Sequence, residues 1–140
     1  MGGAPANTQT EEKAFEFPHG LFGFPTARRF LITDVPGGGD LIKQMVALDV
    51  PDLAFTLVDP FAFFHGYAPD LPEAELAELG VTQPEQVVVM AIANVPASIE
   101  EATANLKAPI VFNPHTRKAR QVILSDDRYT TRHRLFQKRK

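Results

Sequence analysis

The stretch from Asn105 to Leu124 reads NLKAPIVFNPHTRKARQVIL and predicts two strands joined by a turn. The runs at 108–113 and 120–124 are both rich in β-branched residues, which fit a pleated surface. The Asn-Pro pair at 113–114 favours a turn, because proline presets φ and pushes the preceding residue out of the helical region. The linker at 114–118 is longer than two residues, so we expect a type I turn with a bulge or a five-residue loop. Such a hairpin is marginal alone, and the rest of the chain has to cover its apolar face.

Five more apolar runs bring the number of predicted short strands to seven. They lie at 14–17, 30–32, 41–48, 53–58 and 87–95. The last of them is apolar on both faces, which predicts a central position in the sheet. Pro60 ends the preceding strand, because proline has no N–H to continue the ladder. We therefore expect a mainly β fold: a small antiparallel β-barrel-like domain, or a sandwich, with one or two short helices.

The clearest helix is predicted at 71–80. Pro72 suits its first position, the glutamates that follow favour the N-terminal dipole, and Gly80 suits a left-handed stop. A shorter helical turn is predicted at 98–104, where Ser98 would be the N-cap of a capping box.

Length and composition indicate one soluble domain. The chain has 140 residues, of which 44% are hydrophobic and 22% charged, as is ordinary for globular proteins. No apolar run approaches the length that spans a bilayer, and the first residues lack the basic and apolar regions of a signal peptide. We divide the chain into a disordered leader at 1–12, a single β domain at 13–135 and a basic tail at 136–140. The absence of cysteine excludes disulfides and thiolate chemistry.

Charge is distributed unevenly along the chain. Residues 1–116 carry 5 basic and 15 acidic side chains, whereas residues 117–140 carry 9 basic and 2 acidic ones. An acidic body followed by a basic end bears on the choice of partner and not on the fold.

No pattern in the sequence indicates catalysis or metal binding. The four histidines share no ligand spacing, and we interpret them as loop or tail residues. They are His19, His65, His115 and His133. Ser98 and Ser125 are better explained as cap and turn residues than as nucleophiles, and the glycines at 37–39 lack the lysine of a phosphate-binding loop. We therefore expect no catalytic residue, no metal and no cofactor. A flavin-binding barrel is a weaker alternative, which the absorption spectrum of the purified protein would reveal.

An aromatic cluster follows the Asp-Pro pair that ends the strand at 53–58. Its three phenylalanines lie within four residues and cannot all face one interior. Either most of them fold back as a core plug, or one or two form an exposed apolar patch for a partner segment. With the leucine that follows, the cluster forms our candidate partner-binding site. Its residues are Phe61, Phe63, Phe64, Tyr67 and Leu71.

The end of the chain from Arg128 to Lys140 is basic, with Tyr129 and Phe136 interleaved. That composition can bind phosphate backbones. A solvated terminus is the simpler interpretation, because the excess of arginine and lysine is confined to the end. The alternative is a nucleic-acid-binding regulator that acts through this tail. It predicts salt-sensitive RNA binding that is lost on truncation after Thr131.

Six short motifs follow one another along the chain. They are Gly20-Leu21-Phe22-Gly23-Phe24, Arg28-Arg29-Phe30, the segment from Asp52 to Phe61, the segment from Thr103 to Val111, the segment from Arg120 to Leu124, and Tyr129 with Arg132-His133. Their order and spacing resemble the family of flagellar assembly factors called FliW, from about Phe15 to Leu135. The loop at 37–39 and the basic end after His133 depart from the family pattern. These departures concern an additional function of the tail and not the resemblance to the family.

The resemblance implies a cytoplasmic, non-enzymatic protein that has a small antiparallel β-barrel-like fold and is monomeric when free. It implies two competing partners. One is newly made flagellin, which the factor holds as a chaperone before export. The other is the RNA-binding translational regulator CsrA, which the free factor binds and antagonises, so that flagellin mRNA is translated. No direct nucleic-acid or membrane partner is expected.

Two features of the sequence agree with these implied partners. The acidic body suits a basic RNA-binding protein, because complementary fields speed encounter and set specificity. An apolar groove suits the amphipathic helices that the resemblance implies for the ends of flagellin.

Overall fold

Alternation of apolar and polar side chains along short runs produces strands throughout residues 13–136, the part of the chain that the computed structural model describes. The leader expected at 1–12 and residues 137–140 of the expected basic tail lie outside the described residues. The strands are β1 (Phe15–Glu16), β2 (Arg29–Asp34), β3 (Ile42–Ala47), β4 (Ala54–Val58), β5 (Val88–Asn94), β6 (Thr103–Ala104), β7 (Ile110–Asn113), β8 (Lys118–Gln121) and β9 (His133–Arg134).

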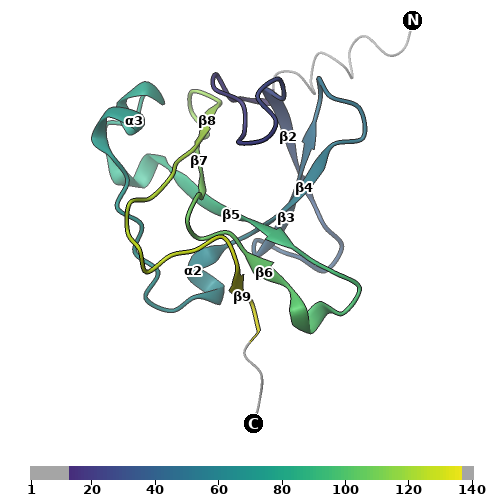
Figure 1. The fold of residues 1–140 in the computed structure, drawn as a ribbon. Helices are drawn as coiled ribbons and strands as arrows, with labels where there is room; N and C mark the ends of the chain where they lie inside the picture. The colour runs from purple at the N-terminus through teal and green to yellow at the C-terminus, as the bar shows by residue number, and fades with distance from the viewer. Residues whose placement is uncertain (1–12, 137–140) are drawn as a thin grey trace, which may run out of the picture.

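Seven of these strands close a barrel in the order β1-β2-β3-β4-β5-β7-β8 (Figure 1). Neighbours run antiparallel, except that β1 and β8 pair in parallel through one register pair, Glu16 with Lys118. The odd number of strands explains this exception, because alternating directions around a ring of seven leave one pair running the same way. β6 pairs with β5, and β9 pairs with β6, so both extend the sheet outside the ring. The predicted mainly β, barrel-like fold is confirmed.

The hairpin of β7 and β8 is tighter than the sequence pattern predicts. Four residues, 114–117, join the strands, because Arg117 adopts a left-handed φ of 59° and its N–H bonds to the Asn113 carbonyl at 2.9 Å. The second strand therefore spans Lys118–Gln121 and not 120–124. Main-chain pairing still continues beyond β8, where the Val122 N–H donates to Pro109 and the Leu124 N–H donates to Lys107.

One apolar core fills the barrel interior. Its fully buried side chains include Phe17, Phe30, Met45, Leu57 and Ile110. Aromatic edges meet faces inside it, since the Phe17 ring lies 5.0 Å from Phe30 and 6.0 Å from Phe112 between centroids. Burial of these large side chains is the main driving force for closing the barrel.

A second core lies outside the barrel, where the two helices and the chain after β8 cover it. Its buried members include Val58, Tyr67, Leu79, Ala91, Val111, Val122, Leu124 and Tyr129. In β5, Met90 faces the barrel interior while Ala91 faces this outer core. β5 therefore lies between two cores, which explains why its sequence is apolar on both faces. The predicted central position of this strand is confirmed.

The helix α3 (Glu73–Glu78) is shorter than the predicted span of 71–80. Pro72 is the N-cap and not the first helical residue, whereas Gly80 supplies the expected left-handed stop with a φ of +77°. The Gly80 N–H bonds to Ala77 and the next N–H, of Val81, bonds to Leu76, which is the Schellman pattern.

Three further helical turns differ from the predictions. α2 (Pro60–Phe63) was not predicted; it begins where Asp59 Oδ1 accepts the N–H of Phe61 at 2.9 Å. The 3-10 turn η1 spans Pro84–Gln86. The predicted capping box at Ser98 is wrong, because its hydroxyl donates to Glu100 and not to the backbone, and only the 3-10 turn η2 (Ile99–Glu101) forms.

Within residues 13–136, no helix has the length and apolar character that a membrane crossing requires.

Candidate functional site

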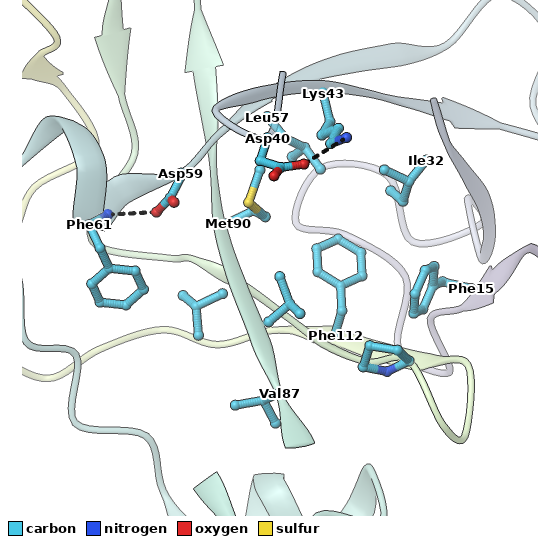
Figure 2. A pocket seen from close by; sticks show the side chains of 13 residues that line it. Phe15, Ile32, Asp40, Lys43, Leu57, Asp59, Phe61, Val87, Met90 and Phe112 are labelled. Atoms are coloured by element: carbon cyan, nitrogen blue, oxygen red, sulfur yellow. Dashed lines mark hydrogen bonds and ion pairs between the residues drawn. The ribbon is translucent and has the colours of Figure 1, made fainter. Parts of the chain in front are cut away.

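A pocket of about 510 Å³ opens at one end of the barrel (Figure 2). The ends of β2, β4 and β7 meet there with the starts of β1, β3 and β5, as alternating strand directions require. The apolar walls come from the barrel interior. They are the side chains of Phe15, Ile32, Leu57, Val88, Met90 and Phe112. We call this hollow the mouth pocket.

Charged groups of both signs surround the mouth pocket. Lys43 Nζ lies 2.6 Å from Asp34 Oδ1 and 3.8 Å from Asp40 Oδ1, and both carboxylates are exposed. The hydrogen bond that the Lys43 ammonium donates to the Asp34 carboxylate raises the pKa of Lys43. Asp59 completes the rim where it caps α2. Asp40, Asp59 and Lys43 thus line the opening, and the Arg117 guanidinium lies 4.3 Å from the centre of the Phe15 ring in its wall.

The candidate aromatic residues do not gather on one surface. Phe61 is 48% exposed and lines the mouth pocket, with its ring 5.6 Å from that of Tyr67. Phe63 and Phe64 are half-buried against the outer core, where Phe63 contacts the ring of Phe136 at 6.2 Å. Phe61 is therefore exposed, as the interpretation of the cluster as a surface patch requires. Phe63 and Phe64 fold back, as the interpretation as a core plug requires.

Tyr67 is buried and fixes the segment that follows α2. Its hydroxyl donates to the Leu106 carbonyl at 2.9 Å, and burial raises its pKa well above the ordinary value. The ring packs edge-on against Tyr129 at 4.8 Å, and the Tyr129 hydroxyl accepts the N–H of Ala68. Leu71 is half-buried beside a separate hollow that Leu76 and Val81 also line.

Sequence reasoning missed a second apolar patch next to Phe63. Val95, Ile99 and Phe136 are exposed there and line a hollow of about 310 Å³. These residues lie in a loop, a 3-10 turn and the end of the described chain, where periodicity carries no signal.

The acidic helix α3 is tied to the barrel by ion pairs. Arg120 on β8 lies 3.0 Å from Glu75 and 2.7 Å from Glu78, and His19 lies 2.6 Å from the same Glu78 oxygen. The hydrogen bonds from His19 and Arg120 lower the pKa of Glu78. Exposed pairs of this kind contribute little stability, so their effect is to orient the helix.

The described part of the basic end folds against the body. Tyr129 is buried, which leaves its ring unable to stack on a nucleic-acid base. Arg128 pairs with Asp126 at 2.7 Å, and Arg134 donates to the Glu100 carbonyl. Among residues 13–136, no three side chains of the metal-ligating types converge.

His133 makes the attachment of this end sensitive to pH. Its Nε2 accepts the N–H of Thr130 at 2.8 Å, and burial lowers its pKa below the ordinary 6.5. His133 therefore binds protons more readily in the unfolded chain than in the folded one. The contribution of neutral His133 to the free energy of unfolding declines as the pH falls below 6.5.

The free energy of unfolding of the native protein should exceed that of His133→Gln by less at about pH 5.5 than at about pH 8. The reason is that glutamine does not titrate, whereas His133 does. Urea unfolding at both pH values measures it. A difference that grows on acidification would contradict the assignment.

Comparisons with known proteins point to one family. A family model described as FliW protein matches residues 5–135. The chain is 57% identical over 126 residues to the flagellar assembly factor FliW of Symbiobacterium thermophilum, covering 90% of this chain and 91% of that protein. It is 42% identical to the flagellar assembly factor FliW of Moorella thermoacetica, covering 86% and 76%. A crystal structure of the flagellar assembly factor FliW matches with a TM-score of 0.85 at 34% identity, over 91% of this chain and 89% of that one.

Proposed function

The chain belongs to the FliW family of flagellar assembly factors, and from this premise we propose that it binds flagellin in the cytoplasm before export. When flagellin has been exported, the free protein binds and antagonises the translational regulator CsrA. Flagellin translation is thereby coupled to export, and the protein makes and breaks no covalent bond. The observation that carries this proposal is the family match over nearly the whole chain.

The exposed aromatic group beside the mouth pocket supports a binding role. Phe61 presents 48% of its surface to solvent next to apolar walls, and exposed aromatic side chains at a pocket are typical hot spots. Phe63 and Phe64 offer partner contacts only through their exposed edges. Tyr67 and Leu71 act indirectly in this proposal, because they hold the segment that carries Phe61.

The charge distribution supports the proposed choice of partners. Residues 1–116 have an excess of acidic side chains, with 15 acidic and 5 basic ones. An RNA-binding regulator is basic where it binds phosphates, so its encounter with an acidic surface is accelerated and depends on salt.

Phe61→Asp should weaken the binding of flagellin or of CsrA by more than about 1 kcal/mol, because it places a charge at an apolar contact. Calorimetry with each purified partner measures the loss. Phe22→Asp is the matched control. Phe22 is 58% exposed and lies between β1 and β2, at the barrel end opposite the mouth pocket.

Two results would count against the proposal in different ways. Unchanged affinity of a folded Phe61→Asp variant for both partners removes this residue from the site. Failure of the native protein to bind either partner ends the proposed function itself. Titration of one partner into the preformed complex of the other tests whether their binding is exclusive.

A further inference from the structure

A hollow of about 430 Å³ lies between α3, the turn η1 and the start of β5. Figure 1 shows α3 outside the ring of strands. Four half-buried apolar side chains, which also pack on the outer core, form the floor of this hollow. They are Leu71, Leu76, Val81 and Val87. Glu73 and Ala77 line it from α3, and both are exposed. We call this hollow the α3 groove.

The wall of the α3 groove that follows α3 is fixed by its own hydrogen bonds. The Val81 N–H donates back to the Leu76 carbonyl at 3.0 Å. Gln86 Oε1 accepts the N–H groups of Thr82 and Gln83 at 2.6 and 2.9 Å. A partner therefore meets a preformed surface, and binding costs little ordering of this segment.

The main chain along the groove offers almost nothing to an added strand. Of residues 79–87, only Glu85 has an N–H group without a partner in the described part of the chain, apart from Pro84, which has no N–H. A partner is therefore held through side chains. An amphipathic helix suits such a groove, because its own main-chain groups are already paired within the helix.

Carboxylates dominate the charge of this region. Residues 66–87 carry five of them and no lysine, arginine or histidine. Glu75 and Glu78 lie three residues apart on another side of α3, where Arg120 pairs with both and His19 pairs with Glu78. The other three are exposed and have no ion pair within residues 13–136. They are Asp70, Glu73 and Glu85.

Among the described residues that line the groove, none is basic. Two cations from other segments are already paired, since Arg128 lies 2.7 Å from Asp126 and Lys107 lies 3.9 Å from Asp127. The remaining basic side chains near α3 belong to β8 and to the turn that meets the end of this helix, and none of them lines the groove. They are His115, Arg117 and Lys118. The apolar floor therefore has a rim of unneutralised negative charge.

We propose that the α3 groove binds a basic amphipathic helix of a partner protein. The apolar face of that helix packs on the floor, and its lysines or arginines lie opposite the three exposed carboxylates. Nucleic acids and acidic membranes are repelled by the same carboxylates. The inference adds a second docking surface to the one at Phe61, and it rests on the proposed function only in that the chain works by binding other proteins.

The probe is the labelled peptide acetyl-Lys-Leu-Ala-Lys-Leu-Leu-Lys-Lys-Leu-Ala-Lys-Leu-amide, whose leucines share one face of a helix. Its binding to the full chain is followed by fluorescence anisotropy. A second peptide has the same composition, with its leucines spread around the helix. We expect it to bind about tenfold more weakly, because it cannot bury its leucines while its lysines face the rim. Equal affinities, or no binding of the first peptide, would overturn the proposal.

Two alanines of α3 give a matched pair of protein variants. Ala74 and Ala77 are both exposed, but only Ala77 lines the groove. Replacement of either by lysine changes the net charge equally, and lysine is a good helix former. We expect Ala77→Lys to weaken peptide binding by about tenfold or more, and Ala74→Lys to change it by less than about twofold. Equal effects would indicate a diffuse attraction between opposite charges, which overturns the proposal.

Glu73→Gln tests the charge of the rim. It removes one of the unpaired carboxylates. Glu101→Gln is the control, because Glu101 is exposed in η2 and does not line the groove. We expect Glu73→Gln to weaken peptide binding by about threefold at low salt and the control to leave it unchanged. Equal affinities of the two variants would overturn the pairing of basic residues with this rim.

Nuclear magnetic resonance of the free protein identifies other occupants of the groove. Ala77→Lys should shift only the amide signals of residues near α3. Shifts at either end of the chain would mean that the chain itself fills the groove. A dimer of the native protein that this variant dissociates would mean that a second copy fills it. Either result would overturn the proposal.

Binding of flagellin and CsrA by the native chain separates this inference from the proposed function. Peptide binding by a chain that binds neither protein would end only the proposed function. Binding of those proteins without peptide binding would end only this inference.

Discussion

Phe17→Ala should lower the free energy of unfolding by about 3 to 5 kcal/mol, because it removes a large side chain from the barrel interior and leaves a cavity. Phe17 is fully buried, and its ring packs edge-on against Phe30 and Phe112. The main chain around it is fixed on both sides, since its N–H donates to Arg28 and its carbonyl accepts from Gly20. Local collapse can therefore fill little of the cavity. Urea unfolding, with the midpoint and slope fitted together, measures the loss.

Phe22→Ala is the control for this change. Phe22 is 58% exposed and only five residues away, so the same truncation should alter stability by no more than about 0.5 kcal/mol. Comparable losses from both variants would contradict the description of the barrel interior as the main source of stability.

Gly20→Ala should have the second large effect, a loss of about 2 to 5 kcal/mol from left-handed strain and steric overlap together. Gly20 has a φ of +66°, and a Cβ added there would lie 2.6 Å from the Pro25 carbonyl oxygen and 2.9 Å from two further backbone atoms of Pro25. The loop cannot easily shift, because the Gly20 N–H donates to the Phe17 carbonyl. In addition, Leu21 and Phe24 exchange two main-chain hydrogen bonds.

Gly23→Ala separates the two causes. Gly23 also has a positive φ, of +86°, but a Cβ there would meet nothing within 4 Å. We expect a loss of only about 1 kcal/mol, from conformational strain alone. Thermal and urea unfolding of both variants provide the comparison. Equal losses would show that the approach of Gly20 to Pro25 contributes nothing.

The barrel strands were predictable because each has a local signal. Short apolar or alternating runs mark or overlap the strands of the ring, and a proline follows β1, β2, β4, β5 and β7 within two residues. β6 and β9 were not predicted, since each has only two residues and forms through pairing between distant parts of the chain. The start of β8 was misplaced because the left-handed φ of Arg117 shortens the turn, and nothing in the composition of the turn marks that conformation.

The candidate site was predictable only in part. A dense group of aromatic residues signals a feature at 61–67, but burial of each ring depends on what the fold brings to it. Tyr67 is buried because Leu106 and Tyr129, far along the chain, meet it. The mouth pocket gave no local signal, since separate strands contribute one or a few wall residues each.

The parallel pair of Glu16 with Lys118 has a consequence for the timing of folding during synthesis. The first strand of the ring finds its last neighbour only after more than a hundred further residues have been made, and loop closure over such a span is slow. A ribosome must therefore release most of the chain before the ring can shut. Until then the phenylalanines of the unfinished interior are open to chaperones, proteases and other nascent chains.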